Sequence, residues 1–87
     1  MNDKQLANEI YRIIEPLWNK MPNTIYNVRV VIPKYGDKVN IFFEWNKVGK
    51  STTSRPIKSY PAKYQPMMND VIDILKSEHK LNVVVYN

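Results

Sequence analysis

The sequence contains no cysteine, which excludes disulfide bonds, thiolate nucleophiles and thiolate metal sites. It has only two glycines, Gly36 and Gly49, and both lie in segments with turn character, so no glycine-rich loop can cradle a nucleotide phosphate. No apolar run is long enough for a signal peptide or a membrane span. These absences favour a reducing compartment, and we expect a cytoplasmic protein with no membrane partner.

Acidic residues are missing from a long central interval of the chain. None occurs between Glu44 and Asp70, whereas five cations fall there: Lys47, Lys50, Arg55, Lys58 and Lys63. The whole chain has a formal net charge of +5 at pH 7, which favours acidic partners, nucleic acid among them, without selecting one.

The length of 87 residues and the even composition predict a single domain, residues 1–87. With 44% hydrophobic and 24% charged residues the chain is expected to fold rather than stay disordered. A chain of this size buries only a little more than about 60% of its unfolded surface, so dimerisation would stabilise it.

The residue pattern in the first half of the chain predicts a helix followed by a hairpin. Asn2 and Gln5 have the spacing of a capping box, and Pro16 is expected to kink or restart the helix, leaving a separate last turn at Leu17, Trp18 and Met21. Residues 24–32 alternate as a half-buried strand, and a turn at Gly36 leads to a second strand that pairs antiparallel with the first. Its apolar side is predicted to carry Val39, Ile41, Phe43 and Trp45.

The residue pattern in the second half of the chain predicts an edge strand, a second helix and a last strand. Residues 51–58 are polar and interrupted by Pro56, which suits a short strand at a sheet edge. Residues 59–65 are interpreted as an extended connection, with Pro66 at the first position of the helix. An apolar stripe then marks the helix, and residues 81–86 form a strand with neighbours or layers on each side. The stripe consists of Met68, Val71, Ile72 and Leu75.

The predicted fold class is α+β, in the order α-β-β-β-α-β. A right-handed crossover through the second helix places the last strand parallel to the first, which gives a mostly antiparallel four-stranded sheet of order 3-2-1-4. Both helices cover one face of this two-layer sandwich. The other face is predicted to present Arg29, Val31 and Phe42, with Tyr35 in the adjoining loop, as a face for a partner or for dimerisation. Scattered exposed apolar residues are the alternative interpretation.

No group of residues predicts catalysis, a metal site or a cofactor. His79 is the only histidine and is expected to be a solvated surface residue near the end of the second helix. Asp70 and Asp73 supply only two oxygen ligands, and each other carboxylate has an ordinary solvated position. We therefore expect a protein that is not an enzyme, with no catalytic residue, no bound metal and no cofactor.

The central cations are the candidate binding residues: Lys47, Lys50, Arg55, Lys58 and Lys63. Lysine and arginine neutralise phosphates or carboxylates, and aromatic rings nearby, at Tyr35, Tyr60 and Tyr64, can stack on exposed bases. The alternative is a lysine-rich strand edge that discourages aggregation. The order of elements and the basic charge resemble the double-stranded RNA-binding domain. The lysine cluster that begins the second helix of that family is missing here.

Two stretches that flank the aromatic hairpin are similar to the YezG-like immunity (antitoxin) proteins of bacteria: LANEIYRIIEPLW (Leu6 to Trp18) and YPAKYQPMMNDVIDIL (Tyr60 to Leu75). The resemblance implies a protein that neutralises a toxin or enzyme by stoichiometric binding. The chain departs from that family in its basic charge and in its last strand. The leading hypothesis is thus a non-enzymatic binding protein of inhibitor or immunity type with an acidic protein partner, acting as a monomer or homodimer. The alternative is a protein that binds RNA or DNA through the basic segment.

Overall fold

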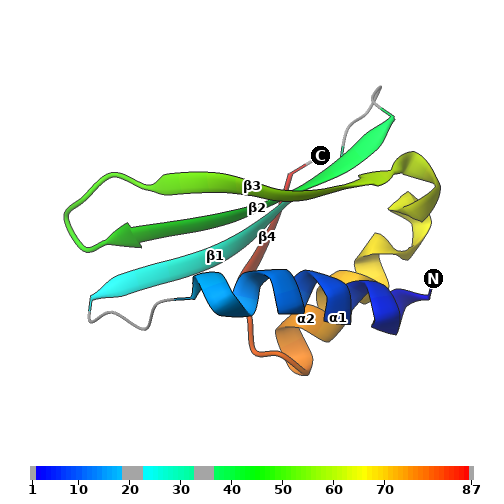
Figure 1. The fold of residues 1–87 in the computed structure, drawn as a ribbon, viewed down its shortest axis with the longest axis horizontal. Coiled ribbons are helices and arrows are strands. Elements are labelled where there is room, and N and C mark those ends of the chain that lie inside the picture. The colour runs from blue at the N-terminus through cyan, green and yellow to red at the C-terminus, as the bar shows by residue number, and fades with distance from the viewer. Residues whose placement is uncertain (1, 19–22, 33–36, 87) are drawn as a thin grey trace.

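The computed structural model describes residues 2–18, 23–32 and 37–86, which form a sheet with two helices on one of its faces (Figure 1). In chain order the elements are α1 (Asp3–Ile14), a 3-10 turn η1 (Glu15–Leu17), β1 (Thr24–Val31), β2 (Lys38–Lys47), β3 (Thr53–Pro61), a 3-10 segment η2 (Ala62–Met67), α2 (Met68–Ser77) and β4 (Val83–Tyr86). The strand order is β3-β2-β1-β4, as the sequence predicted.

Helix α1 begins with the predicted capping box. The Asn2 side chain accepts a hydrogen bond from the Gln5 backbone N–H at 2.8 Å, and the Gln5 side chain accepts one from the Asn2 N–H at 3.0 Å. The helix ends where Pro16, which cannot donate a backbone hydrogen bond, forces the chain into η1. The predicted last turn is therefore a 3-10 turn that stops at Leu17, and Met21 lies outside the described residues.

The sheet mixes antiparallel and parallel pairing. Strand β1 pairs antiparallel with β2 and parallel with β4, and β2 pairs antiparallel with β3. The crossover through α2 that returns β4 to the side of β1 is the arrangement expected for a parallel pair. The predicted apolar side of β2 is confirmed, because Val39, Ile41 and Phe43 are buried against the helices.

Strand β3 is longer than the sequence predicted. It runs through Pro56 to Pro61, and its register against β2 shifts between Ile41 and Phe42. Proline is tolerated because β3 is an edge strand, and the irregularity adjusts its pairing. The expectation of an extended connection over residues 59–65 is thus wrong: the strand takes the first part, and η2 takes the rest.

The start of α2 and the environment of β4 also differ from expectation. Pro66 lies inside η2, and α2 begins two residues later at Met68. After α2, Lys80 adopts a left-handed conformation with φ 59°, and the Leu81 N–H donates to the Leu75 carbonyl at 3.0 Å, which closes the helix. Among the strands of the described residues, β4 has a neighbour on one side only, so the prediction of neighbours or layers on each side is wrong.

One hydrophobic core lies between the helices and the sheet. It is built from α1, α2 and the helix-facing residues of all four strands, and Leu6, Ile10, Ile14, Met68 and Leu75 have no exposed surface. Burial of such side chains contributes roughly 1.5–3 kcal/mol each and fixes the helices to one face. Across the described segments, no helix has the length and apolarity needed to cross a bilayer.

Substitution of Gly49 in the β2–β3 turn is predicted to destabilise the protein through backbone conformation alone. This residue has φ +82°, and an added Cβ would contact nothing within 4 Å. Gly49→Ala is therefore expected to lower the free energy of unfolding by about 1 kcal/mol, measured by urea denaturation, because only the left-handed backbone is penalised. Gly49→Asn serves as the control and should cost less, since asparagine tolerates this region. Equal losses for both variants would contradict a backbone origin.

Candidate functional site

The sheet extends beyond the end of α1 (Figure 1). Aromatic side chains gather on its helix-facing side there. Tyr26 of β1 lies opposite Trp45 of β2, and Trp18 follows η1. Ring centroids are 5.7 Å apart for Trp18 and Tyr26, 5.8 Å for Tyr26 and Phe43, and 5.6 Å for Phe43 and Trp45. We call these four residues the aromatic row. Phe43 is buried in the core, whereas the other three remain half-buried.

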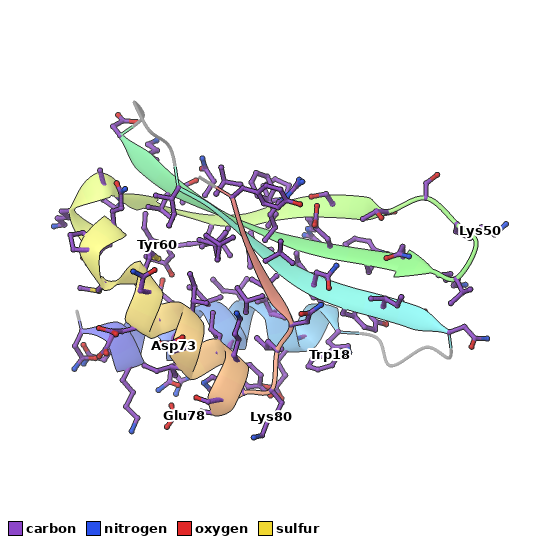
Figure 2. All side chains as sticks on the ribbon, turned by 180° about the vertical axis from the view of Figure 1, so that it is seen from behind. Trp18, Lys50, Tyr60, Asp73, Glu78 and Lys80 are labelled. Carbon is purple, nitrogen blue, oxygen red and sulfur yellow. The ribbon has the colours of Figure 1, made fainter. Side chains whose placement is uncertain are left out.

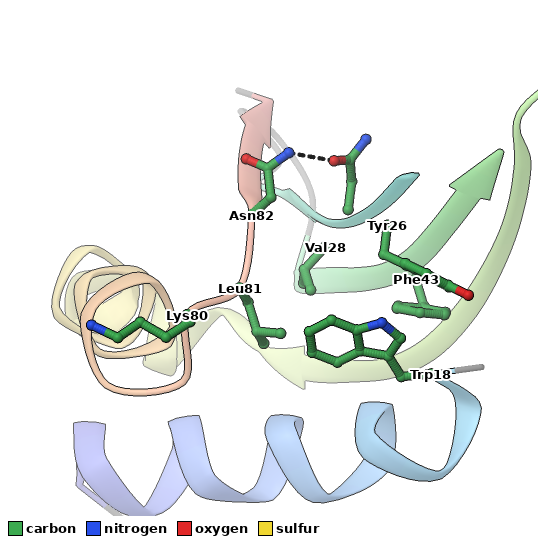
Figure 3. Close-up of a pocket in the computed structure, with 8 residues that line it drawn as sticks. Trp18, Tyr26, Val28, Phe43, Lys80, Leu81 and Asn82 are labelled. Carbon is green, nitrogen blue, oxygen red and sulfur yellow. Dashed lines mark hydrogen bonds between the residues drawn. The ribbon is translucent and has the colours of Figure 1, made fainter. Parts of the chain in front are cut away.

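A small cavity opens beside the aromatic row (Figure 3). We call it the aromatic pocket; its volume is about 140 Å³, and it is lined by Trp18, Tyr26, Asn27, Val28, Phe43, Lys80, Leu81 and Asn82. An apolar cavity of about 150 Å³ holds one benzene molecule, so this pocket has the size of a single aromatic or branched side chain. Asn82 donates a hydrogen bond to Asn27, and the Lys80 side chain extends away from Trp18 (Figure 3).

Three of the predicted binding cations surround the same end of the sheet, and we call them the hairpin cations: Lys47, Lys50 and Arg55. Arg55 lies opposite Phe43 and Lys47 opposite Thr24, so both residues share the face of the aromatic row. Lys50 occupies the β2–β3 turn, at the tip of the hairpin in Figure 2. All three are exposed, and none forms an ion pair with a carboxylate of the described residues.

The other two predicted cations lie toward the opposite end of β3. The Lys58 Nζ forms an ion pair with Glu9 of α1 at 3.4 Å, and the Lys63 Nζ lies 5.3 Å from the ring centroid of Tyr64 in η2. At about 3.3 Å per residue, Lys58 lies about 10 Å further along β3 than Arg55, and Lys63 lies beyond the end of the strand. The structure thus divides the basic segment into two groups, and Lys58 already has an internal partner.

The predicted partner face is the side of the sheet that the helices leave uncovered. Arg29 lies directly opposite Phe42, and Val31 is two residues further along β1; Tyr35 lies outside the described residues. Arg29 forms an ion pair with Glu44 at 3.2 Å and lies 4.3 Å from the ring centroid of Tyr86. A hydrogen bond to Tyr86 and the charge of Glu44 raise the pKa of the Arg29 guanidinium. The positive charge of Arg29 at the centre of this face is therefore already paired with Glu44 of the same chain.

The structure corrects the expectation that His79 is a solvated surface residue. It is half-buried, its ring stacks on Tyr11 with centroids 4.2 Å apart, and its Nε2 lies 3.1 Å from Oδ1 of Asn8. It therefore links the end of α2 to α1. Asp70 and Asp73 are exposed on α2, and across residues 2–18, 23–32 and 37–86 no three histidine or carboxylate groups converge on a metal site.

Sequence reasoning missed the aromatic pocket and the role of Trp18 and Tyr26 in it. A signal was present, because Tyr26, Phe43 and Trp45 all occupy the apolar side of their strands. The missing information was the register of β1 against β2 and the point at which α1 stops covering the sheet. Tyr60, proposed as a stacking ring, is 4% exposed and belongs to the core, so it is unable to receive a base.

Comparison of the chain with protein-family models, with curated proteins and with solved structures finds no match.

The raised pKa of Tyr60 predicts that the protein loses stability at alkaline pH. Burial raises the pKa of its hydroxyl above the ordinary value of 10.0, and the negative charge of Glu9 adds to this effect. Because the unfolded chain releases this proton more readily, the contribution to stability is fully present below pH 10 and is lost as the pH rises above it. Tyrosinate absorbance should show that one of the six tyrosines ionises only with unfolding.

Tyr60→Phe is the control for this prediction. It should flatten the alkaline decline in the free energy of unfolding, and at neutral pH it should change that free energy by less than about 1 kcal/mol, because the approach of the hydroxyl to Glu9 falls short of the geometry of an ordinary hydrogen bond. An alkaline decline of unchanged steepness in this variant would assign the effect to another group.

Proposed function

We propose that this chain is a non-enzymatic binding protein of inhibitor or immunity type, which neutralises a protein partner by stoichiometric contact with an acidic segment. The observation that carries the proposal is the aromatic pocket together with three cations at the same end of the sheet that form no ion pair among the described residues. The pocket supplies an anchor point, and the hairpin cations supply charge attraction. These two elements are what a compact surface needs to hold one segment of another protein.

The aromatic pocket suits one inserted side chain of the partner. Its walls are the rings of Trp18, Tyr26 and Phe43 together with Val28 and Leu81, and the amide side chains of Asn27 and Asn82 also line it. Interface anchors are commonly aromatic or aliphatic side chains that fill such a pocket and exclude water. Burying one contributes roughly 1.5–3 kcal/mol, which corresponds to about ten- to a hundredfold in affinity.

The hairpin cations favour acidic residues next to that anchor. Lys47 and Arg55 are on the same face of the sheet as the pocket, and the sequence offers no carboxylate between Glu44 and Asp70 to neutralise them. Exposed ion pairs contribute about 0.2–1 kcal/mol each, so three of them add roughly a factor of ten and also accelerate association. Charge therefore guides the partner, and the pocket holds it.

The two tryptophans of the chain make this proposal directly measurable, because both belong to the aromatic row. Titration with a glutamate-rich peptide containing one central phenylalanine should change the tryptophan fluorescence saturably. The same peptide with alanine at the centre should bind at least about tenfold more weakly, since it leaves the pocket empty. Replacement of Lys47, Lys50 and Arg55 together by Gln should weaken binding of the phenylalanine peptide by roughly tenfold.

A matched variant separates site charge from net charge. Lys38, Lys63 and Lys76 are exposed cations away from the aromatic row, and their joint replacement by Gln removes the same three charges. This variant should keep the peptide affinity within about twofold, because exposed charges beyond about 10 Å are screened. Equal losses in the two triple variants, or equal binding of the phenylalanine and alanine peptides, would contradict the proposal.

Nucleic-acid binding is the second candidate, and the surroundings of Trp45 favour it. Trp45 shares a surface hollow with Asn46, Lys47, Lys50, Ser51 and Thr53, so an aromatic face lies beside two phosphate-binding groups. For this function, affinity for single-stranded or duplex oligonucleotides must fall steeply with salt, and the slope must shrink when the hairpin cations are removed. Absence of oligonucleotide binding at low salt would eliminate it.

A further inference from the structure

The two edges of the sheet differ in how they resist pairing with another strand. The β3 edge carries Pro56, which has no backbone donor, and the exposed cations Arg55 and Lys58, and its register against β2 is irregular. Proline, lysine-type charge and bulges are the devices by which natural sheets prevent addition of a further strand. The β3 edge is therefore protected.

The β4 edge has none of these devices. Its sequence is Val83-Val84-Val85-Tyr86, without charge, proline or glycine, and β1 is its single neighbour in the sheet. Val85 is 38% exposed and Tyr86 46% exposed, so this apolar edge is accessible to solvent. Residues of this type have high strand propensity and pair well across strands. In Figure 2 β4 crosses in front of the other strands, and it is an edge of the sheet that the described residues form.

The backbone of β4 leaves one set of polar groups directed away from the sheet. The carbonyls of Asn82 and Tyr86 accept hydrogen bonds from the N–H groups of Val28 and Ile32, both at 2.8 Å. Because backbone groups alternate in direction along a strand, the N–H and C=O of Val83 and Val85 point to the opposite side. They have no hydrogen-bond partner among the described residues.

We infer that the β4 edge binds β4 of a second copy of this chain, antiparallel and about a two-fold axis at Val84. In this register Val83 of one copy faces Val85 of the other, and each such pair exchanges N–H···O bonds in both directions. The same pairing occurs twice by symmetry, so every outward-directed group of Val83 and Val85 is satisfied. The product is a continuous eight-stranded sheet.

The edge fits a copy of itself better than an acidic partner. An uncharged strand offers no attraction to a carboxylate-rich segment, whereas two identical uncharged strands meet without repulsion despite the net charge of +5. Pairing also covers the exposed surface of Val85 and Tyr86 in both copies. The inference is independent of the aromatic pocket and of the proposed function.

The test is the concentration dependence of molar mass, measured by sedimentation equilibrium up to millimolar protein. The wild-type chain is expected to rise from 10.3 kDa to about twice that value. Val85→Pro should remain at 10.3 kDa, because it removes only the outward N–H, which the monomer does not use. Val85→Thr is the matched control, since it keeps that N–H and the strand propensity, and it should dimerise as the wild type does.

A second readout covers the case in which Val85→Pro fails to fold. In amide hydrogen exchange the Val83 and Val85 N–H groups should become protected as wild-type concentration rises, whereas the Val84 N–H, which faces β1, should not change. Val85→Lys, which keeps the N–H but places charge beside the two-fold axis, should also stay monomeric. A wild type of constant 10.3 kDa, a folded Val85→Pro dimer, or a dimer with unprotected Val83 and Val85 would overturn the inference.

Discussion

The register of β1 against β2 is the constraint on which both faces of the molecule depend. It places Tyr26 opposite Trp45 on the helix side and Arg29 opposite Phe42 on the other side. Because side chains alternate along a strand, a slip by one residue would move Val28 and Val30 out of the core. It would also turn Tyr26 to the other face of the sheet, away from the aromatic row. The burial of Val28, Val30, Ile41 and Phe43 against the helices holds this register in place.

Pro16 sets the second condition for the candidate site. It ends α1 at a point where the sheet continues, so the helix-facing side of the sheet beyond the helix is contacted by a single side chain after η1, Trp18, through Tyr26 (Figure 1). A longer helix would fill the aromatic pocket with its own next turn. The same residue that limits helix length thus leaves a pocket on the side of the sheet that also carries Lys47 and Arg55.

The sequence predicts the fold well because its signals are local. The capping box at Asn2, the alternation in β1 and β2, and the right-handed crossover together lead to the observed strand order. The errors arise where tertiary contacts decide: β3 passes through Pro56 because β2 pairs with it despite an irregular register, and Pro66 lies in η2 rather than at the start of α2. For the site, charge alone could not distinguish Lys58, which binds Glu9, from Arg55, which has no ion-pair partner among the described residues.

The two interpretations of the basic segment, edge protection and partner binding, are compatible once the topology is known. Strands β3 and β4 form opposite edges, so in the proposed dimer the charge on β3 would direct strand addition to β4, away from the hairpin cations. A dimer joined through β4 leaves the aromatic rows of both copies accessible at separate places on one extended sheet. Two linked sites raise the effective affinity for a partner that offers two acidic segments, without any new contact in either site. The protection of one edge and the openness of the other thereby become parts of a single binding arrangement.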